Sequence, residues 1–170
     1  MTKQETVVGA TGVASSPRHV VTSSRGAATS AAPPFAWPIR VYWEDTDAGG
    51  IVYYANYLKF MERARTEWLR SAGVEQEPLR QEYGLQFVVV DVEAHFRKPA
   101  RYGELLRVTC AVASATRASL TFRQEIHRDA PDAAQLLDGL VRVACVDQAG
   151  RPRAMPESLT DRIGSREMKR

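Results

Sequence analysis

The 170-residue sequence has no long hydrophobic run and only two cysteines. Its longest strongly apolar run covers residues 87–90, whereas a membrane-spanning helix needs about 18 or more such residues, so we predict no membrane span. Cys110 and Cys145 stand in alternating apolar segments, where we expect buried thiols in preference to a disulfide or a metal site. This usage predicts a reducing compartment and therefore a cytoplasmic location.

The sequence also lacks a large excess of charge of either sign. The net charge is +3 at pH 7, and the net +2 of residues 1–34 leaves only +1 for the rest of the chain. Acidic and basic side chains are interspersed along that remainder without a block of one sign, so the sequence lacks the basic footprint that nucleic-acid binding requires. We predict no nucleic-acid partner.

Several catalytic motifs are absent as well. The sequence contains no His-Glu-x-x-His, no paired Cys-x-x-Cys, no phosphate-binding glycine loop and no Gly-x-Ser-x-Gly elbow. The acidic segment from Asp45 resembles the start of a calcium loop, but its fifth position is Gly49 and its twelfth is Asn56, where oxygen ligands are needed. We therefore expect neither a metal nor a cofactor.

The chain divides into two parts. Residues 1–34 are dominated by Ser, Thr, Ala and Gly and end in Pro33-Pro34, a composition typical of a disordered N-terminal extension. Residues 35–170 alternate between periodic apolar segments and turns, which predicts one folded domain.

Hydrophobic periodicity predicts the elements of that domain. A strand over residues 39–44 stops at Asp45, and a long helix follows, with Asn56 as N-cap and Gly73 as C-cap. A short helix over 78–83 and four strands over 85–97, 105–114, 119–127 and 136–147 complete the pattern. The strand connections are too short for crossover helices, so we expect an α+β fold in which one long helix packs on an antiparallel sheet whose last four strands form a meander.

The acidic loop stands directly before the positive end of the long helix. A carboxylate there could polarise a carbonyl group, but Asp45 and Asp47 could equally serve as turn or capping residues. Their spacing does not decide between these roles.

Four segments of the sequence carry a resemblance to a known family. They are WPIRVYWEDTDAGGIVYYANY (37–57), FMERARTE (60–67), FRKPARYGE (96–104), and CVD (145–147) with RPRAMP (151–156). Together they resemble the hotdog-fold acyl-CoA thioesterases of the 4-hydroxybenzoyl-CoA thioesterase type, in particular the branch associated with the bacterial Tol–Pal system. The resemblance covers residues 37–163 and implies a long central helix wrapped by a five-stranded antiparallel sheet.

The resemblance also implies roles for individual residues. Asp47 would be the catalytic carboxylate, as general base or nucleophile, and the Tyr54 backbone amide would donate to the thioester carbonyl, a role that suits a helix start. Many Tol–Pal-type relatives carry His at the position of Tyr54, so a His-assisted mechanism is not expected here. Asn56 and Tyr57 match the motif but are expected to be helix cap and core. The implied substrate-binding positions are Gly50, Val52, Arg117 and Ser119, although a solvated hairpin end would equally account for the last two.

The resemblance implies partners too. The substrate would be an acyl-CoA or acyl-carrier-protein thioester bound at the seam of a homo-oligomer, either a dimer or a tetramer. Two other functions remain as alternatives: a non-catalytic hotdog module that binds an acyl carrier protein or a cell-envelope partner, and a hotdog hydratase. A pure binder has no need of the Asp47 carboxylate, and the loop lacks the Asp-x-x-x-x-His pair that would suit a hydratase.

Overall fold

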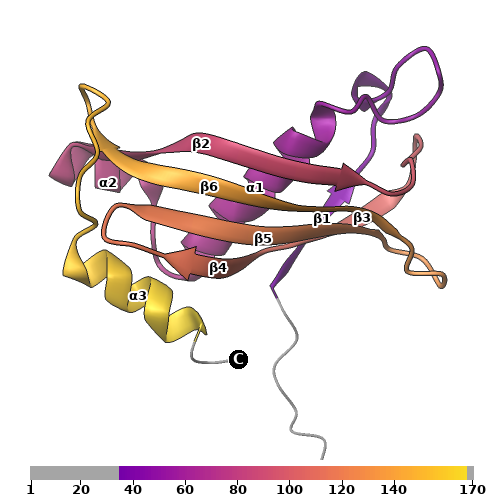
Figure 1. The fold of residues 1–170 in the computed structure, drawn as a ribbon. Helices are drawn as coiled ribbons and strands as arrows, with labels where there is room; N and C mark the ends of the chain where they lie inside the picture. The colour runs from indigo at the N-terminus through magenta and orange to yellow at the C-terminus, as the bar shows by residue number, and fades with distance from the viewer. Residues whose placement is uncertain (1–34, 168–170) are drawn as a thin grey trace, which may run out of the picture. The chain divides into compact units, whose positions relative to one another are not determined.

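The computed structural model describes residues 35–167, and the extension predicted for residues 1–34 lies outside them. The described residues form six strands, three α-helices and one 3-10 turn (Figure 1). In chain order these are β1 (Ala36–Arg40), η1 (Trp43–Asp45), α1 (Asn56–Ser71), α2 (Gln76–Tyr83), β2 (Leu85–Phe96), β3 (Leu105–Thr109), β4 (Ala111–Ala115), β5 (Ser119–Arg128), β6 (Gln135–Asp147) and α3 (Glu157–Glu167).

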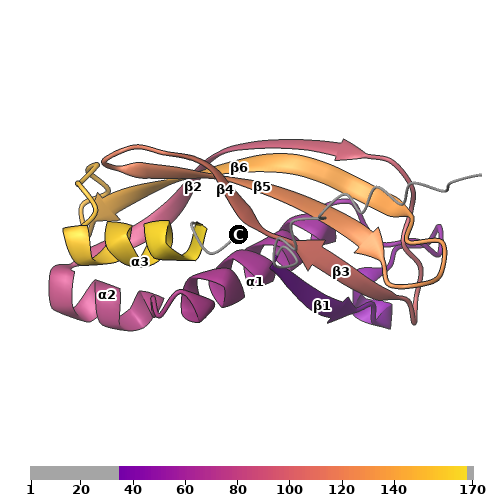
Figure 2. The ribbon, with the colours of Figure 1, turned by 90° about the horizontal axis from the view of Figure 1, so that it is seen from below.

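The strands form one antiparallel sheet, and α1 lies along one of its faces (Figure 2). The strand order is β1-β3-β5-β6-β2, with β4 beside β5. The predicted α+β class is therefore confirmed. The sheet has six strands because the predicted strand over residues 105–114 is broken at Cys110, whose amide donates to the Phe35 carbonyl at 3.1 Å.

The predicted meander is confirmed for its last three strands, since β3 and β4 pair with β5 and β5 pairs with β6, but its first strand is misplaced. β2 pairs with β6, as in the register Val92↔Val141, and not with β3, its successor in the chain. β1 takes the place beside β3, with Ile39 opposite Leu106. The 13 residues of β6 offer the 12 residues of β2 a partner along their whole length, whereas β3 has only five residues. For β2, the length of the available partner strand thus outweighs the order along the chain.

Two predicted boundaries around the acidic loop are also wrong. β1 ends at Arg40, and residues 43–45 form a 3-10 turn because the Asp45 carboxylate accepts the Tyr42 amide at 2.9 Å. Asn56 does not cap α1 but is its first residue, and its side-chain amide donates to the Asp45 carbonyl at 3.0 Å.

Two shorter helices, α2 before β2 and α3 after β6, complete the described fold. α2 ends before Gly84, whose φ of +64° is the left-handed conformation that favours glycine, as the sequence predicts. The predicted start at Pro78 is two residues too late. The sequence analysis missed α3. Among its residues up to 164, the buried side chains are Leu159 and Ile163, too few for a clear helical pattern.

The core lies between α1 and the sheet. The buried face of α1 includes Phe60, Ala64 and Trp68, and the Trp68 ring meets Phe122 of β5 edge to face at 5.4 Å. Both cysteines are buried, as predicted. Among residues 35–167, no helix has the length and apolar character needed to cross a membrane.

Candidate active site

The loop between η1 and α1 holds Asp47 at the start of a tight turn. Thr46 and Val52 form an antiparallel bridge across the loop, and the Asp47 amide donates to the Ile51 carbonyl at 3.0 Å. Gly50 closes the turn with φ +71°, and its amide donates to the Asp47 carbonyl at 2.9 Å. These backbone bonds fix the position from which the Asp47 side chain projects.

The Asp47 carboxylate is exposed and has one oxygen engaged. Oδ1 accepts the Gly49 amide at 2.8 Å, an Asx turn of the kind that the sequence analysis left open. Within the described residues, Oδ2 accepts no hydrogen bond. The turn therefore orients the carboxylate and leaves its second oxygen open to solvent.

Asp45 has a structural role. It is buried, its carboxylate holds the Tyr42 amide, and its carbonyl accepts both the Tyr53 amide at 2.9 Å and the Asn56 side chain. These bonds tie η1 to the start of α1. The two acids of the loop thus differ in role, because one is buried among backbone donors and the other is exposed.

Tyr54 lies in the turn that leads into α1. The Tyr53 carbonyl accepts the Asn56 amide at 2.8 Å, which places Tyr54 at the second position of that turn. Within the described residues, the Tyr54 amide has no acceptor. An unsatisfied amide at the N-terminus of a 16-residue helix combines a hydrogen-bond donor with the positive end of the helix dipole.

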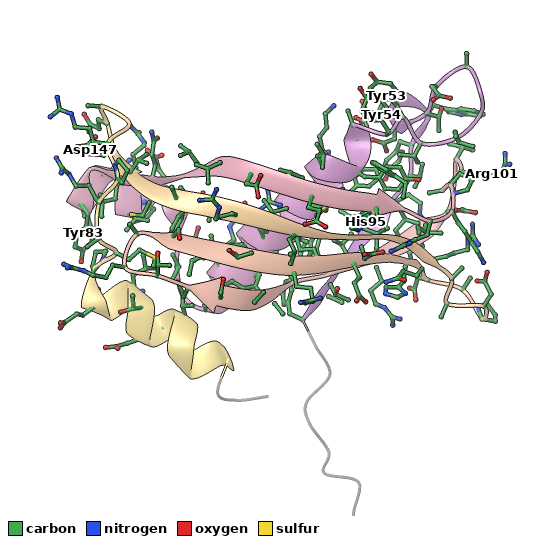
Figure 3. The ribbon with its side chains drawn as sticks, viewed as in Figure 1. Tyr53, Tyr54, Tyr83, His95, Arg101 and Asp147 are labelled. Atoms are coloured by element: carbon green, nitrogen blue, oxygen red, sulfur yellow. The ribbon has the colours of Figure 1, made fainter. Side chains whose placement is uncertain are left out.

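The side chains of Tyr53 and Tyr54 both lie at this end of α1 (Figure 3). Their rings pack with centroids 4.7 Å apart, and the Tyr54 ring is 61% exposed. The neighbouring Tyr54 hydroxyl raises the pKa of Tyr53, and the negative charge of Asp47 adds to that rise. Asp47 and this tyrosine pair are therefore electrostatic neighbours.

The other predicted binding positions do not share one location. Gly50 is exposed in the Asp47 loop. Val52 is buried, and its amide donates to the Ala100 carbonyl at 2.9 Å. Arg117 and Ser119 lie at the β4–β5 turn, at the opposite end of β5 from Arg128.

That separation places Arg117 and Ser119 far from the Asp47 loop of the same chain. Arg128 donates to the Pro99 carbonyl at 3.3 Å, next to the Ala100 that anchors the loop. The ten residues of β5 span about 30 Å. A single chain does not bring Arg117 or Ser119 to Asp47.

The sequence analysis missed an aromatic pair beside the loop. Trp43 and Tyr102 stack with ring centroids 3.9 Å apart, and both are exposed. Trp43 follows the alternating pattern of a strand, so its exposure in a 3-10 turn has no signal in the sequence. His95 lies on the sheet (Figure 3), and its Nδ1 is 3.3 Å from Oδ2 of Asp138. The described residues contain no group of three His, Cys, Asp or Glu side chains that could hold a metal ion.

A central helix covered by an antiparallel sheet has counterparts among known proteins. Residues 49–134 match the thioesterase superfamily. The acyl-CoA thioesterase YbgC of Haemophilus influenzae is 41% identical over 126 residues, 74% of this chain and 90% of that protein. The acyl-CoA thioester hydrolase YbgC of Escherichia coli O6:H1 is 42% identical over 126 residues, 74% of this chain and 92% of that protein.

Solved structures agree with these relatives. The crystal structure of a probable thioesterase from Bartonella henselae has a TM-score of 0.63 and 34% identity, and the match covers 73% of this chain and 100% of that one. The class is that of hotdog-fold thioesterases. The chain belongs to the thioesterase superfamily, which confirms the predicted hotdog fold and the predicted thioester hydrolysis.

Proposed function

We propose that this chain hydrolyses acyl-CoA thioesters at the start of α1, with Asp47 as the catalytic carboxylate and the Tyr54 amide as the donor to the thioester carbonyl. One observation carries the proposal: an exposed carboxylate with an open oxygen lies in the loop ahead of a helix N-terminus whose Tyr54 amide has no acceptor among the described residues. The names of the YbgC relatives support the substrate class.

The chemistry requires both groups. Attack on the thioester carbon places negative charge on the carbonyl oxygen, and an aligned amide at a helix N-terminus stabilises that charge where it develops. Asp47 either removes a proton from the attacking water or attacks the carbonyl carbon itself, in which case water then hydrolyses the acyl–Asp47 anhydride and restores the carboxylate. The sulfur leaves as a thiolate, and the second product is the free acid.

We further propose that the site is completed by a second copy of the chain. β2 is an edge strand of 12 residues, and three of its valines are strongly exposed: Val89, Val90 and Val92. A long apolar edge strand pairs readily with another strand, and a two-fold axis through its middle would pair β2 with its own copy in antiparallel fashion.

Such pairing would also resolve the separation found within one chain. The Asp47 loop lies near the Phe96 end of β2, where the Ala100 carbonyl anchors it. Arg117 lies near the other end of β2, because Leu85 pairs with the part of β6 that adjoins the β4–β5 turn. Antiparallel pairing brings opposite ends of β2 together. Arg117 and Ser119 of one copy would then approach Asp47 of the other and contact the CoA portion of the substrate.

Replacing Asp47 with Asn tests the catalytic role. The Asn amide oxygen can still accept the Gly49 amide, so the turn and the fold should persist while the basic oxygen is lost. We expect turnover of acyl-CoA thioesters, followed by release of free thiol, to fall by about 100-fold or more. Glu44→Gln is the matched control, because Glu44 is an exposed carboxylate in the same segment, and it should retain turnover.

A folded Asp47→Asn variant with normal turnover would refute the catalytic role of Asp47. It would favour the alternative in which the chain is a non-catalytic module that binds an acyl carrier protein or a cell-envelope partner. A single turnover in H₂¹⁸O tests the nucleophilic role of the carboxylate, since label in Asp47 requires that water opens a mixed acyl–Asp47 anhydride at the Asp47 carboxyl carbon. Carrier-protein substrates, a cytoplasmic location and an association with the Tol–Pal system stay predictions.

A further inference from the structure

A positive charge lies buried beneath the sheet. Arg65 on α1 is only 8% exposed, and burial lowers the pKa of its guanidinium, which nevertheless keeps its charge at neutral pH. Its Nη1 donates to Oε1 of Gln124 on β5 at 2.8 Å, and the Gln124 amide nitrogen donates in turn to the Met61 carbonyl at 2.9 Å. Gln124 is therefore fixed with its oxygen toward Arg65.

The guanidinium is only partly satisfied. Among the described residues, the bond to Gln124 is its single hydrogen bond, and no carboxylate there forms an ion pair with it. The Cys110 thiol and the Glu62 carboxylate, one turn earlier on α1, favour the charge electrostatically. Oε1 of Glu62 already accepts the Thr66 hydroxyl at 2.8 Å. A guanidinium has five N–H donors, so Arg65 retains donors for a further acceptor.

Those donors adjoin a small cavity. Arg65 lines a space of about 80 Å³ between α1 and the sheet. The opposite wall is mainly apolar and is formed by Phe87, Val89, Leu120, Phe122 and Val143. The helix side is lined by Glu62, Thr66, Leu69 and Gln76 as well as Arg65. An apolar wall facing a few placed polar groups is the usual form of a small-molecule subsite.

From this geometry we infer that Arg65 recognises an oxygen at the far end of the acyl group, so that the enzyme favours acyl chains carrying a terminal hydroxyl or carboxylate over plain hydrocarbon chains. The inference rests on the proposed function, because the acyl chain must start at the Tyr54 amide. The cavity has room for a small polar group and a few carbons, not for a long tail.

The position of Arg65 suits an acyl chain of medium length. Arg65 follows Asn56 by nine residues, which corresponds to about 14 Å along the axis of α1. Helix side chains point back toward the N-terminus, so the guanidinium lies nearer to Tyr54 than its backbone does. Val89 belongs to the β2 edge at which the proposed dimer closes, so a chain that enters along this seam reaches the cavity.

The test compares acyl-CoA thioesters that differ only at the far end. The full-length protein is assayed with hexanoyl-, 6-hydroxyhexanoyl- and adipoyl-CoA, and with octanoyl-, 8-hydroxyoctanoyl- and suberoyl-CoA. In at least one set, we expect a higher kcat/KM for a thioester with a terminal hydroxyl or carboxylate than for the plain hydrocarbon thioester. Arg65→Met should lower this kcat/KM ratio at least about tenfold, the loss typical of a hydrogen bond to a charged group. Arg65→Lys should restore part of it.

Arg63→Met is the matched control. Arg63 is exposed on the same turn of α1, over the Phe60 ring at 5.9 Å, and its removal should leave the preference unchanged. If Arg65→Met does not fold, inhibition of the wild-type enzyme by free acids takes the place of this variant. Adipate and suberate should then inhibit thioester hydrolysis more strongly than hexanoate and octanoate.

The outcomes separate two kinds of failure. Hydrolysis of the thioesters without any preference for the oxygen-bearing chains, or with a preference that Arg65→Met retains, overturns the subsite and leaves Arg65 as a structural residue. Absence of hydrolysis for all six thioesters counts against the proposed function itself.

Discussion

Deleting a single N–H group at Tyr54 tests the proposed oxyanion donor directly. Tyr54 occupies the second position of the turn closed by the Tyr53 carbonyl and the Asn56 amide, a position that favours proline. Tyr54→Pro therefore removes the amide proton in a backbone geometry that proline adopts. Because the Tyr54 amide has no acceptor among the described residues, no hydrogen bond within them is lost.

The expected magnitudes for stability and catalysis differ widely. Proline at a compatible site stabilises by about 0.4–1 kcal/mol through the unfolded state, whereas loss of the ring contact with Tyr53 costs about 0.5–1.5 kcal/mol. The two nearly cancel, so the free energy of unfolding should change by about 1 kcal/mol at most. Loss of one oxyanion donor, by contrast, typically lowers kcat by about 100 to 1,000-fold.

The assay measures kcat for an acyl-CoA thioester together with the urea midpoint and the circular dichroism spectrum. Tyr54→Phe and Tyr54→His are the controls, because both keep the amide, and their activity should stay within about tenfold of the wild type. Full activity in a folded Tyr54→Pro variant would remove the amide from the mechanism. A collapse of activity in folded Tyr54→Phe would transfer the role to the phenol hydroxyl.

Two further predictions concern assembly and stability. Val90→Lys should weaken the proposed dimer, because two lysines would meet near the two-fold axis, and sedimentation should show a lower mass. Tyr83→Lys, at a similarly exposed position on α2, is the control and should leave the mass unchanged. An unchanged mass for Val90→Lys would exclude β2 pairing. Tyr57→Phe should lower the free energy of unfolding in urea by about 1–3 kcal/mol, because the buried hydroxyl that accepts the Ala100 amide at 2.8 Å is lost. An unchanged urea midpoint would show that the Ala100 amide finds another acceptor.

The local features of this protein could be predicted from its sequence. The apolar stripe of α1, the left-handed Gly84 after α2 and the turn chemistry of the acidic loop depend on neighbours a few residues apart. The location of a carboxylate just ahead of a helix start follows from the same short-range rules. The family motif implies roles for Asp47 and Tyr54. The structure places Asp47 in the loop between η1 and α1, with one open carboxylate oxygen, and Tyr54 in the turn before α1, with an amide that has no acceptor among the described residues.

Only the tertiary structure decided which distant segments meet. The pairing of β2 with β6, the burial of Asp45 and the separation of Arg117 from the Asp47 loop depend on strand lengths and on which faces become buried. Arg65 illustrates the limit most clearly, because a charged residue in a helix is ordinarily exposed, and only the contact with Gln124, 59 residues away, holds its guanidinium beneath the sheet. Sequence periodicity reports what a residue does to its own helix or strand, whereas burial depends on which remote surface covers it.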